Sequence, residues 1–406
     1  MNDKNNLFKL TGKVQHYSWG GPSFLPDLLG ISPVEGKPFA EYWLGAHDNF
    51  PAEIQGAEQP LLNEYIKQNQ SVLGPEVAAE FQRLPYLFKV LDVKDMLSIQ
   101  VHPSRQAAIQ EFEQENKAGI PINAPNRNYK DDNHKPELMV ALSDFWLLHG
   151  FKHPEAIKDC IRLIPEFSFM ALLFEEGRYE QLYGRLMEMD QQEVNAILQP
   201  LLDRILPAYE NNGIRKENPD FWAARAAISF NEPGRIDRGI FSIYLLNLVN
   251  LNKGEAIFQD AGILHAYLEG QNMEIMANSD NVLRGGLTSK HIDVKELIKH
   301  INFTPITPTV IYGTRKNSFE EEYVSPARDF QLSRLQVKEN ETASIGSFTA
   351  EIFIVMEGLV ELKEENGYVL TVEKGESAVA FAGAVMTIRA VQDAVLFRAS
   401  VPTKVA

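Results

Sequence analysis

The 406-residue chain lacks the features of a secreted or membrane-spanning protein. It contains a single cysteine, Cys160, so it can form no intrachain disulfide, and a cysteine-based zinc site is excluded. The longest apolar run, residues 239–251, is interrupted by Ser242 and Asn247 and is too short to span a bilayer. Residues 1–10 are polar and lack the apolar centre of a signal peptide. We therefore expect a cytoplasmic protein with no membrane partner.

Positive charge is also scarce. The chain has 39 Lys and Arg against 55 Asp and Glu, which gives a formal net charge of -16. Such a surface repels nucleic acid and anionic lipid, so neither is expected as a partner. An anionic substrate would have to be met by a local basic pocket.

The remaining composition is that of an ordinary globular protein, with 44% hydrophobic and 23% charged residues. The length exceeds one typical domain and predicts two or three folded units. Residues 1 to about 150 contain short strand-like runs between glycines and prolines, such as 13–19 and 86–93. Further strands are expected at 240–251, 256–259, 351–362, 368–372 and 377–381.

The stretch from about 152 to 225 differs, because its apolar residues follow helical spacing. Asp190 with Glu193 indicates a capped helix start, and Pro200 is expected to interrupt or kink the helix that follows. The apolar positions that define the two expected helices are Tyr179, Leu182, Tyr183 and Leu186, then Val194, Ile197, Leu198, Leu201 and Ile205. We interpret this stretch as a helical insertion that packs or covers the rest and carries no chemistry of its own.

Two segments share one glycine spacing. Gly254 is followed by five residues, Asp-Ala-Gly, two residues and His265; Gly375 is followed by five residues, Phe-Ala-Gly, two residues and Met386. This spacing resembles the second motif of the cupin β-barrels, whose metal-binding His falls at His265 or Met386. We therefore expect a metal ligand in the first copy and none in the second. The second barrel should instead be closed by apolar packing of Val379, Phe381, Met386 and Ile388.

Four side chains are candidate ligands for a divalent metal. Gln100 and His102 alternate along an expected strand and so share one face, opposite Ile99 and Val101. Glu137 follows Pro136, and His265 comes much later in the chain. Imidazole and carboxylate favour zinc without any thiolate. Taken singly, a His in an apolar strand is more often a core residue and a Glu after Pro a surface charge, and spacing alone does not join the four.

Six segments, in this order, resemble motifs of the type I phosphomannose isomerases. They are Tyr-Ser-Trp-Gly at 17–20, Ala-Glu-Tyr-Trp-Leu-Gly-Ala-His at 40–47, Pro-Tyr-Leu-Phe-Lys-Val-Leu at 85–91, Ser-Ile-Gln-Val-His-Pro at 98–103, Asn-His-Lys-Pro-Glu at 133–137 and Asn-Ser-Asp-Asn-Val-Leu-Arg-Gly-Gly-Leu-Thr at 278–288. The resemblance covers about residues 8 to 300. It departs from the family at Asp48, where Pro is common, and at 262–264, where Thr-Pro usually precedes the His.

This resemblance implies a zinc-dependent aldose–ketose isomerase that interconverts mannose 6-phosphate and fructose 6-phosphate through an enediol-type proton transfer. The implied ligands of one zinc ion per chain are Gln100, His102, Glu137 and His265. The implied fold is mainly β, with two cupin-like (jelly-roll) barrels and a helical domain. We expect a catalytic barrel at 1–151 with 226–315, the helical insertion at 152–225 and a metal-free barrel at 316–406, in a monomer whose partner is a sugar phosphate.

The reaction needs an acid/base group, positive charge near the developing oxyanion and a phosphate clamp. The resemblance makes Arg284 the first catalytic candidate, and a forked guanidinium suits an enediolate. Lys135 and His134 flank Glu137 and are expected beside the metal, where like charge favours the neutral, basic form of Lys135. The remaining substrate-contact candidates are Lys89, Tyr267, Glu274 and Asp280, with Ser98 and Lys290 for the phosphate.

Several alternatives remain open at this point. Lys89 would be an outward-facing strand residue and Lys290 a solvated charge if neither binds substrate, whereas Gly285 and Gly286 allow the backbone beside Arg284 to approach a ligand closely. A cupin-type metal oxidoreductase acting on a small organic acid would use three His or two His and one carboxylate. A non-enzymatic sugar-phosphate-binding module would not need Arg284 and Lys135. An assay for fructose 6-phosphate formation, with and without chelator, separates all three.

Overall fold

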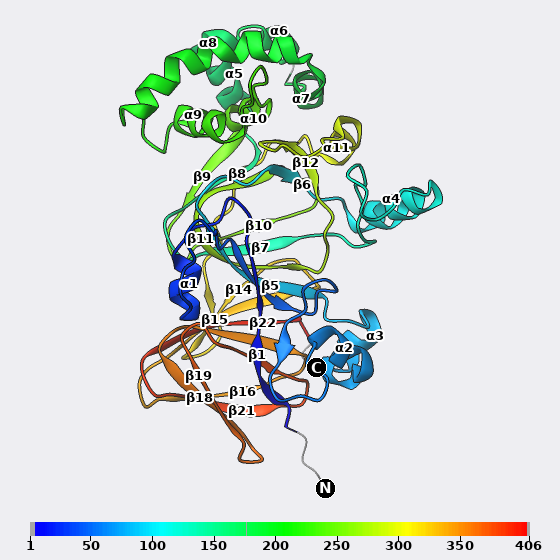
Figure 1. The fold of residues 1–406 in the computed structure, drawn as a ribbon, viewed down its shortest axis with the longest axis vertical. Coiled ribbons are helices and arrows are strands. Elements are labelled where there is room, and N and C mark those ends of the chain that lie inside the picture. The colour runs from blue at the N-terminus through cyan, green and yellow to red at the C-terminus, as the bar shows by residue number, and fades with distance from the viewer. Residues whose placement is uncertain (1–4, 176, 404–406) are drawn as a thin grey trace.

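The computed structural model describes residues 5–175 and 177–403 of the chain. The described strands form antiparallel sheets of ten, eight and four strands. Most helices gather at one end of an elongated molecule and the C-terminal strands lie at the other (Figure 1). The expectation of a mainly β fold is confirmed at the coarse level of a chain rich in antiparallel sheet.

The ten-stranded sheet lies in the middle of the molecule and is organised around one long strand, β11. Its main path runs β10-β7-β11-β5-β3-β2; β6 and β8 also pair with β11, while β12 pairs with β6 and β9 with β8. The strands are β2 (Lys13–Gln15), β3 (Glu41–Gly45), β5 (Tyr86–Val93), β6 (Ile99–Val101), β7 (Glu137–Ala141), β8 (Phe145–Phe151), β9 (Leu246–Leu251), β10 (Ala256–Gln259), β11 (His265–Ala277) and β12 (Leu283–Gly286).

Strand β11 changes partners at Gly270. Its first residues pair with β6 and β8, and the part from Gly270 onward pairs with β5 and β7. Gly270 has φ +126°, and a Cβ there would lie 2.6 Å from the carbonyl oxygen of Asp144, so only glycine fits. The change of partners lets one strand carry His265 and Glu274 to two parts of the same site.

The helices of residues 154–245 pack against the β6–β8–β12 end of this sheet. They are α5 (Pro154–Leu163), α6 (Met170–Leu173), α7 (Tyr179–Glu188), α8 (Gln191–Glu210), α9 (Pro219–Phe230) and α10 (Gly239–Leu245), with α11 (Val294–His300) beside them. The expected helices at Tyr179 and Val194 are present, and the Asp190 side chain caps α8 by accepting from the Gln192 amide. Pro200 does not interrupt α8, which also runs through Pro207; the buried face that packs on α9 outweighs the lost hydrogen bonds.

The expected strand at 240–251 is wrong over its first half. Residues Gly239–Leu245 form helix α10, and β9 begins only at Leu246. All seven residues of α10 are buried, so the run has no polar face whose spacing could distinguish helix from strand. The other helices are α1 (Phe24–Leu29), α2 (Leu62–Gln68), α3 (Pro75–Glu80) and α4 (Arg105–Lys117), with 3₁₀ turns at Gln70–Leu73 and Pro165–Phe167.

The eight-stranded sheet combines the C-terminal strands with the first strand of the chain. Its order is β13-β14-β15-β22-β17-β20-β1-β4, and β1 pairs with β20 so that Leu7 lies opposite Ala380. The strands are β1 (Leu7–Thr11), β4 (Glu53–Ile54), β13 (Thr314–Arg315), β14 (Glu320–Tyr323), β15 (Gln331–Val337), β17 (Glu351–Glu357), β20 (Ser377–Ala380) and β22 (Ala394–Ser400). Residues of this sheet share an apolar core with the four-stranded sheet β16 (Thr342–Gly346), β21 (Val385–Ala390), β18 (Leu359–Glu364) and β19 (Val369–Glu373). The expected strand at 351–362 is split at Gly358, which has φ +84°.

The repeated glycine spacing produces the same backbone twice. Gly254, Gly262, Gly375 and Gly383 all have φ between +80° and +92°, and each copy is a strand, a turn and a second strand. In the second copy Met386 and Ile388 are buried in the core between the two C-terminal sheets. The expectation that Val379 and Phe381 pack with them is wrong: Val379 of β20 and Phe381, the residue after this strand, both face the core shared with the ten-stranded sheet.

Candidate metal centre and active site

Three of the four predicted ligands meet in one buried cluster. His102 follows β6, Glu137 begins β7 and His265 begins β11, and their ligand atoms all lie within 4.8 Å of one another. The Nε2 atoms of His102 and His265 lie 3.3 and 3.4 Å from the two carboxylate oxygens of Glu137. The spacing alone did not join these residues; β11 does, because it pairs with β6 and β7.

Both imidazoles are oriented with a lone pair toward the cluster. The Nδ1 of His102 lies 2.8 Å from the carbonyl oxygen of Asn281, and the Nδ1 of His265 lies 2.9 Å from that of Ile263. A carbonyl only accepts, so each Nδ1 donates and each Nε2 is left as the acceptor, which is the arrangement of a metal-binding His. The Nε2 of His102 is buried and has no hydrogen-bond partner among the described residues, so a cation would satisfy it.

The electrostatics of the cluster also fit a cation. Burial lowers the pKa of His102 to about 4, which keeps the ring neutral and able to coordinate. Burial alone would raise the pKa of Glu137, but Lys135 and His102 outweigh it and hold the pKa well below its usual range. Two neutral imidazoles and one carboxylate form a donor set suited to zinc.

Gln100, the fourth predicted ligand, lies next to this cluster on β6. In register it pairs with His265 on one side and Arg284 on the other. Ile99 and Val101 are fully buried in the core on the opposite face, while Gln100 is half-buried and its side chain forms no hydrogen bond within the described residues.

A second group of charges centres on Lys89 of β5. Its Nζ lies 3.3 Å from Glu41 and 3.5 Å from Glu274, and 4.6 Å from the centre of the Trp43 ring. Burial lowers the pKa of Lys89, but Glu41 and Glu274 outweigh burial and leave it above its usual value. Lys89 is therefore a fixed cation. Tyr267 donates to the second oxygen of Glu274 at 2.8 Å.

Lys135 and His134 point to different places, as neighbours in extended chain do. The Nζ of Lys135 lies 3.1 Å from Glu137 Oε1, beside the expected metal. The His134 ring instead lies 2.9 Å from Asp329, a buried residue of the β14–β15 connection. Of the two residues expected beside the metal, Lys135 thus contacts a predicted ligand and His134 contacts Asp329.

A positively charged region lies around Arg284 on β12. Burial lowers the pKa of Arg284, and burial together with the charge of Arg284 lowers the pKa of Lys290. The pKa of Lys130, which the sequence did not single out, is lowered by burial and partly by Arg284 as well, although Glu115 opposes it. The Arg284 guanidinium forms no ion pair within residues 5–175 and 177–403, so its charge remains available to an anion. Ser98 lies just before β6, half-buried.

Gly286, beside Arg284, packs closely against the backbone of another element. A Cβ on Gly286 would lie 2.4 Å from the Cα of Gly239, and Asp237 accepts the amides of Gly239, Leu287 and Thr288. The close approach expected at this position is therefore made by the start of helix α10. Sequence reasoning could not distinguish a neighbouring backbone from a ligand.

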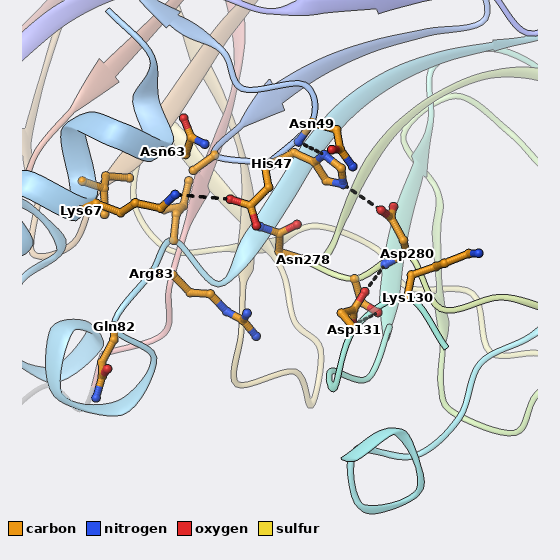
Figure 2. Close-up of a pocket in the computed structure, with 15 residues that line it drawn as sticks. His47, Asn49, Asn63, Lys67, Gln82, Arg83, Lys130, Asp131, Asn278 and Asp280 are labelled. Carbon is orange, nitrogen blue, oxygen red and sulfur yellow. Dashed lines mark hydrogen bonds and ion pairs between the residues drawn. The ribbon is translucent and has the colours of Figure 1, made fainter. Parts of the chain in front are cut away.

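A cavity of about 260 Å³ opens beside Asp280 (Figure 2). The strand connection that carries His47 forms one side of it, and the loops that carry Lys130 and Asp280 form the other. Asp280 also feels the charges of Lys135 and Lys89, so the cavity borders the charged cluster. Glu41, Trp43, His47 and Lys130 were not predicted as site residues; the first three lie within the family motif at 40–47, which was the available signal.

In the part of the chain that the structure describes, no helix is long and apolar enough to cross a bilayer.

Comparisons with known proteins agree with one another. Residues 7–154 match the model of the phosphomannose isomerase type I catalytic domain. The chain is 38% identical to the mannose-6-phosphate isomerase of Salmonella typhimurium over 378 residues (91% of this chain, 93% of that protein) and 33% identical to the human one (87% and 88%). The crystal structure of the Salmonella typhimurium enzyme bound to substrate and a zinc atom is similar with a TM-score of 0.87 at 34% identity, covering 98% of this chain and all of that one. A zinc-bound structure of mannose 6-phosphate isomerase has a TM-score of 0.85 at 33% identity, with the same coverage. The chain belongs to the type I phosphomannose isomerase family.

Proposed function

We propose that the chain interconverts mannose 6-phosphate and fructose 6-phosphate with one zinc ion held by Gln100, His102, Glu137 and His265. The observation that carries this proposal is the buried triad of His102, Glu137 and His265. The Nδ1 atoms of both histidines donate to backbone carbonyls, and the Nε2 of His102 has no hydrogen-bond partner among the described residues. The relative with bound zinc and substrate supports the choice of metal and substrate. Zinc in such a site polarises a carbonyl and orients sugar hydroxyls as a Lewis acid.

Residues of the chain itself stabilise the developing charge and transfer the proton. The reaction opens the sugar ring, moves a proton between C2 and C1 and exchanges carbonyl and hydroxyl through an enediol. Arg284 faces the developing negative charge on the oxygens with its unpaired guanidinium. Lys135, which already contacts Glu137, carries the proton. His134, hydrogen-bonded to Asp329, is a second candidate for this role.

The substrate contacts follow from charge and position. Lys89 stays protonated, so in this proposal it donates to a sugar oxygen and does not act as a base. Tyr267, Glu274 and Asp280 bind hydroxyl groups. Ser98 and Lys290 hold the phosphate near Arg284, and Lys130 adds a further positive charge that the sequence did not reveal.

For the architecture, we propose two cupin-like barrels, with the catalytic barrel at 1–151 and 226–315, the helical domain at 152–225 and a metal-free barrel at 316–406. Gly254 and Gly375 adopt the same positive-φ turn at equivalent positions, which supports two copies of one motif. Strand β1 crosses the proposed boundary, because it pairs with β20. We also propose a monomer located in the cytoplasm, where a chain with one cysteine needs no oxidising environment.

A coupled assay for fructose 6-phosphate formation tests the activity. Mannose 6-phosphate should be converted by the zinc-loaded protein, activity should disappear on chelation, and added Zn²⁺ should restore it. His102→Ala and Glu137→Ala should lose both zinc and activity, because removing one ligand commonly costs a site most of its affinity. Full turnover in a metal-free preparation would contradict the zinc assignment, and turnover of an organic acid in place of the sugar phosphate would favour the oxidoreductase alternative.

A further inference from the structure

His47 lies outside the metal cluster and yet is held in a fixed orientation. It follows strand β3 and is 6% exposed. The edge of its ring meets Trp43 at a centroid distance of 5.0 Å, and its face stacks on Phe50 at 6.0 Å. Trp43 also carries the Lys89 ammonium over its ring, so one aromatic side chain supports both residues.

The hydrogen bonds of His47 determine which nitrogen carries its proton. The backbone amide of Asn49 donates to Nδ1 at 3.2 Å, and a nitrogen that accepts must present a lone pair. The ring proton therefore lies on Nε2, which is 3.1 Å from Asp280 Oδ2 (Figure 2). A carboxylate accepts from this N–H, so the ring joins a fixed backbone donor to one defined carboxylate oxygen.

Asp280 is thereby fixed at two points. Its backbone amide donates to Asp131 at 2.7 Å, and its Oδ2 accepts from His47. Burial raises the pKa of Asp280, but the hydrogen bond from His47 and the charges of Lys135 and Lys89 outweigh burial, so the group stays ionised. Within the described residues its Oδ1 forms no hydrogen bond, which leaves one oxygen free beside the charged cluster.

We propose that His47 is a positioning residue: its Nε2–H fixes the rotamer of Asp280 so that Oδ1 accepts a hydrogen bond from a sugar hydroxyl. The inference rests on the proposed function and adds a residue to that site. Without His47 the carboxylate can rotate about its Cβ–Cγ bond, and the free oxygen is no longer held toward the substrate. A shift of the order of 1 Å in such a group can cost about 100-fold in rate.

Two substitutions separate this role from a purely structural one. His47→Gln places an amide N–H near the position of Nε2, so it keeps the donor to Asp280. His47→Asn places its oxygen near the position of Nδ1, so it keeps the acceptor for the Asn49 amide and cannot reach Asp280. If His47 positions Asp280, Gln should rescue turnover and Asn should not; if it only stabilises the loop, Asn should rescue and Gln should not.

The measurements are kcat, KM and zinc content, with mannose 6-phosphate as the substrate. We expect His47→Asn and His47→Ala to retain zinc and to lose kcat by on the order of 100-fold, and His47→Gln to stay within about tenfold of the unsubstituted protein. His153→Gln, at an exposed histidine that contacts Thr307, is the matched control and should change nothing. A crystal structure of His47→Asn should show a rotated Asp280 carboxylate.

The outcomes distinguish the two proposals. If the unsubstituted protein is active and His47→Asn turns over as fast as His47→Gln, the positioning role is wrong while the isomerase assignment stands. An unrotated Asp280 in His47→Asn leads to the same conclusion. A zinc-loaded, unsubstituted protein without isomerase activity overturns the proposed function, and the inference that rests on it falls as well.

Discussion

Arg284 is a cation whose charge is not balanced by a carboxylate among the described residues. It is partly buried, and no carboxylate within the described residues pairs with it. Arg284→Lys keeps the charge and loses the planar fork, so we expect kcat to fall by about two to three orders of magnitude with zinc still bound. Steady-state kinetics and metal analysis on the same preparation check this. Arg315→Lys, on an exposed strand, is the control; near-normal turnover of Arg284→Lys would make Arg284 a structural residue.

Among individual residues, the predictable ones were those whose side chains bind metal by themselves. His102, Glu137 and His265 were identified from residue type and motif, and the structure brings them together. Glu41 and Trp43 were missed as site residues because their role depends on Lys89 of a neighbouring strand, with Glu41 3.3 Å from its ammonium. His134 was placed beside the metal because it neighbours Lys135 in sequence, and sequence adjacency does not specify direction.

At the scale of elements, helix α11 is attached to the loop before β7 by a cluster that responds to pH. Tyr129 and His300 lie 2.6 and 2.9 Å from Glu296 Oε1. The hydrogen bond from His300 lowers the pKa of Glu296 most, and the one from Tyr129 lowers it further. Burial raises this pKa, but the hydrogen bonds outweigh burial and hold it at about 2. A carboxylate whose pKa is lower in the folded than in the unfolded chain stabilises the fold above its unfolded pKa, near 4.3, and loses that contribution as pH falls toward 2.

Glu296→Gln should therefore lower the free energy of unfolding at pH 7. The expected loss is about 1 kcal/mol, because solvent screens a partly exposed carboxylate. The difference from the unsubstituted protein should shrink between pH 4.3 and pH 2. Urea unfolding at pH 7 and at pH 3 measures it, with Glu113→Gln on the exposed face of α4 as the control. A difference that stays constant with pH would show that the carboxylate charge does not contribute.

Elements with a clear polar face were predictable and fully buried ones were not. The spacing at Tyr179 and Val194 identified α7 and α8 because one face of each is exposed. Helix α10 was mistaken for a strand because it has no such face. Of the two effects expected of Pro200, the interruption does not occur, because the packing of α8 on α9 was not part of the local cost of proline.

At the scale of the whole molecule, Tyr86 of β5 joins the ten-stranded sheet to the C-terminal strands. It is fully buried, and its hydroxyl lies 3.0 and 3.1 Å from the carbonyl oxygens of Ala350 and Ala399. Tyr86→Phe removes the donor that these two buried carbonyls share, so the free energy of unfolding should fall by about 1 kcal/mol, the net contribution of a typical hydrogen bond. Urea unfolding measures the loss; Tyr312→Phe, at an exposed tyrosine, should change it by less than about 0.5 kcal/mol.

Metal stoichiometry tests the relation between the two glycine repeats. The last histidine of the chain is His300, and the position equivalent to His265 is Met386, buried among apolar residues. We expect one zinc per chain by elemental analysis, lost in His265→Ala and unchanged in Met386→Leu. Two zinc ions per chain would contradict a metal-free C-terminal domain. The sequence predicted this difference between the copies, but it could not show that Val379 and Phe381 face the other core, because facing depends on which sheets meet.

The pairing of β1 with β20 has a consequence during synthesis. Strand β4 pairs with Leu10 and Thr11 early in the chain, but residue 7 lies opposite residue 380, so the other edge of β1 has no partner until a further 373 residues are made. At about 5–20 residues per second the wait is roughly 20 to 75 s. During that time the edge of β1 that will face β20 is open, and Leu7, which is buried in the finished protein, lacks the strand that covers it. We therefore expect this open edge to be the part of the nascent chain most exposed to wrong strand pairing while translation continues.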